Sequence, residues 1–331
     1  MPIRYIPHPL QVTGCMSATV THVAPGKNYP LGPEIQKGGV NFCVFSKNAR
    51  AMELVFFNDV DDKKPSRVIR LDPQRNKTFY YWHVFVPGVQ EGQLYGYRAY
   101  GKYNPDQGMW FDGSKILLDP YSKSVATGKN YSRQAAKVYG HDNGGEAMKS
   151  VIVDPRNYDW EGDQPLQRPF SQTIIYELHV EGFTKHPSSG LKPELRGTYK
   201  GLVEKIPYLK ELGITAVELM PVQQFDPQDA PGGTNYWGYC PINFFAVHHG
   251  YGTSNDPVQC MKEFRDMVKA LHRAGIEVIL DVVFNHTSEA GFNGTTQCFK
   301  GLENVAYYTF DHGTYQYSNY TGTGNTLNAN H

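Results

Sequence analysis

The sequence predicts a protein with two structural parts, a β-rich first part and an α/β second part with parallel strands. Short strand-like runs separated by turn residues fill about the first 150 positions. After about residue 170, strand-like and helix-like segments alternate. The chain has 331 residues, 40% of them hydrophobic, which is enough for two domains with a substantial core.

Four segments of the first part have the composition of β-strands. They are rich in β-branched and aromatic residues and are bounded by turn residues such as Asn58-Asp59 and Pro87-Gly88. The four predicted strands are residues 40–45, 52–57, 80–86 and 94–100. Short strands at this spacing favour a β-sandwich.

The second part opens with a mostly apolar run at residues 174–180, which is typical of a strand buried on both faces. A helix is expected at about residues 201–212, because apolar residues recur there on one helical face. Gly213 is a suitable C-terminal cap. Pro207 should either kink this helix or mark its true start.

Two more strands flank a second helix. The strands are expected at residues 214–220 and 276–283, and the helix at about 257–274. Asp256 is a good N-cap for this helix, and Gly275 ends it. The alternation of strands and helices predicts a parallel sheet.

Long loops rich in glycine, asparagine and tyrosine follow the last two strands, at about residues 222–255 and 284–331. The second loop shows no clear periodicity. Because α/β barrels build their active sites from loops at the carboxyl ends of strands, the candidate site residues are expected there.

Charge and cysteine content exclude several classes of function. Lys and Arg number 32, as do Asp and Glu, so the absence of a basic excess argues against a nucleic-acid partner. No apolar run is long enough for a membrane span, and the N-terminus does not look like a signal peptide. Five widely spaced cysteines without a C-x-x-C pair favour a cytoplasmic protein, and neither a metal nor a cofactor is expected.

The first chemical signal is the motif D-V-V-F-N-H at residues 281–286. An apolar strand ends there in Asp281, Asn285 and His286. Aspartate is disfavoured in a strand and needs a polar partner. These residues could merely cap the strand and brace the next loop, or they could form a polar cluster at the catalytic end of a barrel.

The second signal is the motif N-Y-W-G-Y-C-P at residues 235–241, which includes Trp237 and Tyr239. Its three aromatic rings could pack the loop onto the sheet, or they could be offered to a ligand. Tyrosine combines an apolar ring face with a polar tip, which suits a sugar ring.

Both motifs resemble those of glycogen debranching enzymes and isoamylases, which are members of the α-amylase superfamily (glycoside hydrolase family 13). Residues 281–286 are similar to the first conserved segment of the superfamily, and residues 235–241 to the N-Y-W-G-Y-x-P segment of debranching enzymes. Further similar segments are residues 39–42, 95–98, 115–121, 174–180, 197–201, 209–215, 219–222 and 319–328.

The resemblance covers about residues 25–331 and implies a multi-domain fold. A glycogen-binding-like β-sandwich (CBM48 type) would precede the first part of a (β/α)8 TIM barrel, which is incomplete in this chain. The expected domains are an extension at 1–24, the sandwich at 25–125, a linker at 126–170, and three barrel strands with long loops at 171–331.

The resemblance also implies a function and residue roles. The activity would be hydrolysis of α-1,6 branch linkages in a branched α-glucan such as glycogen, amylopectin or limit dextrin. Tyr239 would stack on the sugar at the cleavage subsite, with Trp237 also binding substrate. His286 would bind a sugar hydroxyl, while Asn285 and Asp281 would support the site.

The resemblance places the catalytic carboxylates elsewhere. Retaining hydrolysis needs two carboxyl groups about 5–5.5 Å apart. The family's nucleophile lies in a G-F-R-x-D segment, which the sequence lacks, so we expect the nucleophile and the general acid beyond His331 in a longer protein. Glu177 and Glu218 are expected to serve in structural hydrogen bonds. A catalytically inert glucan-binding fragment and another activity of the superfamily are the alternatives.

Overall fold

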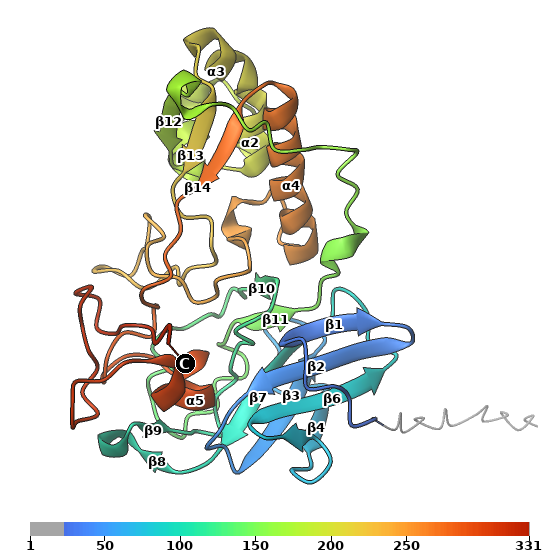
Figure 1. Cartoon of the computed structure of the whole chain (residues 1–331), viewed down its shortest axis with the longest axis vertical. Coiled ribbons are helices and arrows are strands. Elements are labelled where there is room, and N and C mark those ends of the chain that lie inside the picture. Colours follow the sequence, from blue (N-terminus) through green and yellow to red (C-terminus); the bar gives the residue numbers. More distant parts are fainter. Residues whose placement is uncertain (1–22, 331) are drawn as a thin grey trace, which may run out of the picture.

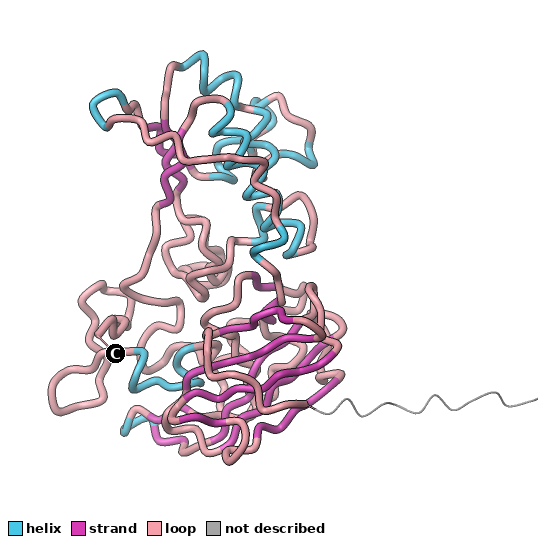
Figure 2. Tube along the Cα trace, turned by 45° about the vertical axis from the view of Figure 1, so that its right-hand side comes forward, coloured by secondary structure: helices cyan, strands magenta, loops and turns pink. Residues whose placement is uncertain are grey.

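The computed structural model describes residues 23–330, which form a β-sandwich and a smaller α/β unit (Figure 1). Long loops connect the two parts, as the pink stretches of Figure 2 show. Residues 1–22 of the predicted N-terminal extension lie outside the described residues, and so does Cys15. Within the described range, no helix is both long enough and apolar enough to cross a membrane.

The sandwich consists of two antiparallel sheets with strand orders β1-β2-β6-β5 and β10-β11-β7-β3-β4, and β8 and β9 form a separate hairpin. All four predicted strands are confirmed to within one residue, as β2, β3, β6 and β7. The strands are β1 Gly32–Gln36, β2 Gly39–Phe45, β3 Ala51–Phe57, β4 Arg67–Leu71, β5 Lys77–Thr78, β6 Tyr81–Pro87, β7 Leu94–Tyr100, β8 Tyr103–Asn104, β9 Met109–Trp110, β10 Ser124–Ala126 and β11 Lys149–Val151.

Aromatic rings join the two sheets of the sandwich. Phe42 of the first sheet meets Phe56 and Tyr95 of the second edge-on, at centroid distances of 5.7 and 5.1 Å. Edge-to-face contacts of this kind add to the stabilisation from apolar burial. Successive side chains of each strand point to opposite faces of the sheet, and the apolar ones lie between the two sheets, as a sandwich requires.

The segment predicted as a linker contributes a strand to the sandwich. β11 pairs antiparallel with both β10 and β7, so residues 127–148 form a loop between two strands of the second sheet. We call this segment the β10–β11 loop. The ammonium group of Lys149 donates hydrogen bonds to the carbonyls of Gly144 (2.5 Å) and Ala147 (2.8 Å) and so fixes the end of the loop.

The α/β unit has a three-stranded parallel sheet of order β12-β13-β14. The strands are β12 Ile175–Leu178, β13 Ala216–Leu219 and β14 Glu277–Leu280. The three predicted strands are confirmed, each shorter at both ends. The helices are α1 Val180–Thr184, α2 Tyr199–Glu204, α3 Ile206–Leu212, α4 Pro257–Arg273 and α5 Phe299–Tyr307.

The predicted helix starts and ends follow from local chemistry. The expected helix at 201–212 divides into α2 and α3, with Pro207 in the first turn of α3, where its missing N–H has no cost. Gly213 caps α3 at φ +81°. The Asp256 carboxylate accepts a hydrogen bond from Val258 N at 2.9 Å and so caps α4, as predicted.

The prediction that residues 174–180 are buried on both faces is wrong. Only one face of the sheet is covered, by α2, α3 and α4, which Figure 1 shows gathered around it. On the other face, Ile175 is 41% exposed and Ile279 is 37% exposed. Three strands do not close into a barrel, so in the described chain no further strand faces this side of the sheet.

Helix α5 lies in a region predicted to be entirely loop. Its residue Leu302 joins the sandwich core. The Ser46 hydroxyl donates to the Leu302 carbonyl at 2.6 Å, and the Glu303 carboxylate accepts from Asn48 N at 2.6 Å. The nine-residue helix is interrupted at Glu303, whose backbone angles are not helical (φ −164°, ψ 73°), so its sequence gives no helical period over several turns.

Candidate functional site

The predicted polar residues meet at the carboxyl ends of the parallel strands. The backbone N–H of Asp281 donates to the Leu219 carbonyl at 2.9 Å, so Asp281 continues β14 beside the end of β13. The loop after β13 returns over this edge. It brings the Tyr239 hydroxyl within 2.7 Å of Asp281 Oδ2, to which it donates a hydrogen bond.

The phenol of Tyr239 is held in its neutral, donating form. Partial burial, and after it the hydrogen bond to Asp281, contribute most to raising its pKa to about 12. The carboxylates of Glu177 and Glu218, on the open face of the sheet, act the same way. Tyr239 therefore keeps its proton at neutral pH and holds its ring at a fixed angle.

The imidazole of His286 lies against the same tyrosine. It is only 7% exposed, and its Nε2 lies 2.7 Å from the Tyr239 carbonyl oxygen. Because a carbonyl can only accept, Nε2 carries the proton. The Asn285 side-chain amide contacts Nδ1. Burial lowers the pKa of His286, so the ring is neutral at neutral pH.

A tight turn places Tyr239 over the sheet. Gly238 has φ +81°, and a Cβ there would lie 2.9 Å from Cδ1 of Phe225. Asn235 holds the turn by accepting from Gly238 N at 3.1 Å and by donating to the Asp226 carbonyl at 3.1 Å. Glycine is therefore required at position 238 both by the left-handed backbone and by the close contact.

The other two aromatic residues of this segment have different surroundings. The Tyr236 ring stacks on His179 at 4.1 Å, and His179 Nε2 donates to the Tyr236 carbonyl at 2.7 Å. Tyr236 therefore packs the loop onto the sheet, which is the first of the two alternatives for these aromatic rings. Trp237 meets the rings of Tyr236 and His179 edge-on. Its side chain is 57% exposed, which leaves the indole accessible to a ligand.

The expectation for Glu177 and Glu218 is wrong. Within residues 23–330, neither side chain has a hydrogen-bond or ion-pair partner. The two residues are register neighbours on β12 and β13, on the face that no helix covers. A surface without protein donors cannot supply the structural bonds that the sequence suggested.

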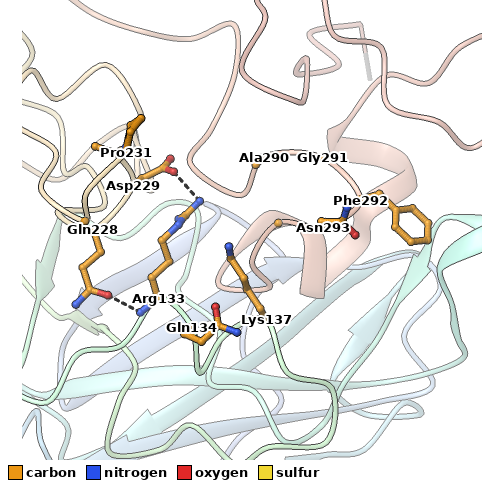
Figure 3. A pocket seen from close by; sticks show the side chains of 13 residues that line it. Arg133, Gln134, Lys137, Gln228, Asp229, Pro231, Ala290, Gly291, Phe292 and Asn293 are labelled. Atoms are coloured by element: carbon orange, nitrogen blue, oxygen red, sulfur yellow. Dashed lines mark hydrogen bonds and ion pairs between the residues drawn. The ribbon is translucent and has the colours of Figure 1, made fainter.

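Sequence reasoning missed a buried arginine that reaches the site from the sandwich. Arg133, on the β10–β11 loop, donates to Asp226 Oδ2 at 2.5 Å and to the Ser288 carbonyl at 2.6 Å, and it pairs with Asp229 Oδ1 at 2.7 Å. Its backbone N–H donates to Gln228 at 2.8 Å (Figure 3). These partners are 93 to 155 residues away in the sequence, so no local motif identifies them.

An open hollow of about 810 Å³ lies beside Arg133 (Figure 3). The β10–β11 loop, the loop after β13 and the loop after β14 form its walls. Polar and aromatic side chains line it: Gln134, Lys137, Gln228, Asp229, Phe292 and Asn293. Its size and its mixed lining suit a polar ligand of several rings.

The structure thus brings four of the five predicted site residues into one connected group, Tyr239 with Asp281, Asn285 and His286, and places Trp237 on the same turn. Among the described residues, including this group, no cluster of three or more histidine, cysteine or carboxylate side chains could hold a metal ion.

Two family models match the chain. Residues 149–322 match the α-amylase catalytic domain, and residues 30–122 match carbohydrate-binding module 48, the isoamylase N-terminal domain. The second match falls on the sandwich, and the first covers the three parallel strands and the long loops.

Curated relatives have consistent names. A glycogen operon protein GlgX homolog of Mycobacterium bovis is 43% identical over 93% of this chain, isoamylase 1 of Arabidopsis thaliana 40% over 93%, and a glycogen debranching enzyme of Salmonella paratyphi B 42% over 94%. The chain spans 44%, 40% and 47% of their lengths.

Solved structures of pullulanases have the same fold. The Paenibacillus barengoltzii enzyme in complex with maltohexaose and α-cyclodextrin is 25% identical, with a TM-score of 0.72 over 91% of this chain and 44% of that chain. The Anoxybacillus enzyme complexed with maltotetraose is 28% identical, with a TM-score of 0.69 over 90% of this chain and 40% of that chain.

Proposed function

This chain belongs to the α-amylase catalytic-domain family, with a carbohydrate-binding module 48 preceding that domain, and on this premise we propose that the protein hydrolyses α-1,6-glucosidic branch linkages of glycogen, amylopectin or their limit dextrins. Relatives named isoamylase and glycogen debranching enzyme support this activity. Pullulanases with bound maltooligosaccharides support an α-glucan as the ligand. The mechanism would be retaining glycoside hydrolysis.

The observation that carries the proposal is the fixed ring of Tyr239 at the carboxyl end of the sheet. Its hydroxyl is anchored on Asp281 at 2.7 Å, so the ring can present a face without a large loss of side-chain freedom on binding. A pyranose has C–H faces that suit such a ring. The accessible indole of Trp237 offers a second aromatic surface nearby.

The polar residues have separate roles in this proposal. We assign to His286 a contact to a sugar hydroxyl, made when its Nε2–H exchanges the Tyr239 carbonyl, which it holds at 2.7 Å in this structure, for the sugar oxygen. Asn285 fixes the ring from the Nδ1 side, and Asp281 fixes the phenol of Tyr239. The hollow beside Arg133 would give further sugar residues room next to this group.

The bond-breaking step is assigned to none of the described residues. Asp281 is engaged by Tyr239, and Glu177 and Glu218 lie on the sheet without the partners that would tune an acid and a nucleophile. Residues 23–330 would thus supply the substrate-binding side of the cleavage subsite. A cytoplasmic location is part of the proposal, and the four free cysteines of the described chain fit it.

The test uses the protein expressed from its native gene. It is incubated with amylopectin limit dextrin, and the released linear chains are separated by anion-exchange chromatography. Release of short linear chains, with unbranched amylose left intact, is the expected result. Cleavage of amylose would point to another superfamily activity. Binding of maltohexaose without any release would support the inert glucan-binding alternative.

A further inference from the structure

We propose that Arg133 positions the cleavage subsite, so that the sandwich module helps to shape a site formed by the α/β unit. The inference rests on the function proposed above. It assigns Arg133 a positioning role and no contact with the reacting atoms. The β10–β11 loop belongs to the sandwich sheet, whereas every partner of the Arg133 side chain belongs to the loops that follow β13 and β14.

One guanidinium group joins these two loops. It binds Asp226 and Asp229 after β13 and the Ser288 carbonyl after β14. Arg133 is 8% exposed and Asp226 is fully buried, so the charge-assisted bond between these two side chains is shielded from water. The planar guanidinium presents donors in several fixed directions, and a lysine ammonium cannot reach all three acceptors in the same way.

The first connection to the subsite runs through the loop after β13. Arg133 fixes the side chain of Asp226, and the carbonyl of the same residue accepts from Asn235 at 3.1 Å. Asn235 in turn accepts from Gly238 N at 3.1 Å. Gly238 directly precedes Tyr239, so three consecutive contacts separate the guanidinium from the stacking residue.

The second connection runs through the loop after β14. Ser288, whose carbonyl Arg133 holds, follows His286 by two residues and donates from its backbone N–H to the Pro241 carbonyl at 2.9 Å. Pro241 follows Tyr239 by two residues. The same bonds that fix Ser288 therefore support the direct contact between His286 Nε2 and the Tyr239 carbonyl at 2.7 Å.

The β10–β11 loop is itself anchored to the sandwich. The N–H of Asn130 donates to Asp61 Oδ1 of the sandwich at 3.0 Å, and within the loop the N–H of Ser132 donates to the Glu146 carbonyl at 3.0 Å. Arg133 thus extends from a braced segment. A shift of the sandwich relative to the α/β unit would be transmitted to Tyr239 and His286.

The test compares KM and kcat of two variants of the native-gene protein on a singly branched maltooligosaccharide. Arg133→Lys keeps the charge but loses the bridging geometry, and we expect KM to rise about tenfold. Arg168→Lys is the matched control. Arg168 also ties the segment after the sandwich to the α/β unit, through the Gly275 carbonyl at 3.1 Å, but at the amino ends of the strands. Its KM should stay within about twofold of wild type.

A purely structural role of Arg133 would reduce the folded fraction, which lowers the apparent kcat and leaves KM unchanged. An unchanged KM for folded Arg133→Lys would overturn the proposal. If that variant does not fold, Asp229→Asn provides the same test, because it removes one acceptor from a partly exposed side chain. It too should raise KM.

The two proposals can fail separately. If the wild-type protein releases no chains, the debranching proposal is wrong. The dissociation constant for maltohexaose, measured by calorimetry, then replaces KM in the same variants. Weaker binding by Arg133→Lys and not by Arg168→Lys would still support the positioning role, and equal binding by both would contradict it.

Discussion

Truncation of Tyr239 is the most direct perturbation of the candidate site. Tyr239→Phe removes the hydroxyl that donates to Asp281 at 2.7 Å. Hydrogen bonds to charged groups contribute about 1.5–3 kcal/mol, but Asp281 is only half-buried, so water can replace the phenol and about 1 kcal/mol is expected. The ring remains in place but less firmly held, which predicts about a fivefold weaker affinity for maltohexaose.

Tyr239→Ala removes the ring as well. A sugar that covers one ring face buries apolar area worth about 1–2 kcal/mol at ~25 cal/mol per Å². Together with the lost anchor, the variant should bind maltohexaose about 30- to 200-fold more weakly than wild type.

Calorimetric titration with maltohexaose measures both variants. The matched control is Tyr208→Ala on α3, which removes an exposed tyrosine at a distance from the carboxyl ends of the strands. Its affinity should equal that of wild type. If folded Tyr239→Ala binds as tightly as Tyr208→Ala, the assignment of Tyr239 to the sugar is refuted.

Three further predictions concern stability. Gly238→Ala, at φ +81° and 2.9 Å from Phe225, should destabilise the fold by about 1–3 kcal/mol in urea titrations and weaken maltohexaose binding. Asp256→Ala should cost about 1 kcal/mol through loss of the α4 cap, measured the same way. Burial raises the pKa of Asp119 from 3.8 to about 6. The contribution of Asp119 to the free energy of unfolding is therefore fully present below about pH 4 and is lost as the pH rises through 6. Relative to wild type, Asp119→Asn should therefore gain up to about 3 kcal/mol between pH 4 and pH 7, and a constant difference would contradict this.

The sequence was informative wherever the cause of a structure is local. The Asp256 cap depends on a bond two residues away, and Gly213 ends α3 through its own backbone conformation. The motif at residues 281–286 likewise places three polar side chains at a strand end by connectivity alone. Such features are properties of a short segment, and the structure confirms them.

The sequence was uninformative where a residue depends on distant partners. Helix α5 has only nine residues and is interrupted at Glu303, so it gives no long helical period and depends on packing against the sandwich through Leu302. Arg133 looks like an ordinary loop arginine until the fold brings Asp226 to it from 93 positions away. The prediction that both faces of the sheet are buried failed for the same reason. An apolar strand sequence does not show whether other segments cover one face of the sheet or both.

These long-range contacts change how the sandwich is best understood. Its name as a carbohydrate-binding module directs attention to a ligand surface of its own, yet several of its buried polar contacts run to the loops after β13 and β14 and to α5. Arg133 joins the two loops around Tyr239 and His286, while Ser46 and Asn48 hold α5 at the other end of the loop after β14. Because that loop is fixed to the sandwich at both ends, the positioning proposal gives the module a part in supporting the contact between His286 and Tyr239, even if no sugar touches the module. Variants on the β10–β11 loop should therefore change substrate affinity, whereas equally destabilising substitutions in the sandwich core should change only the melting temperature.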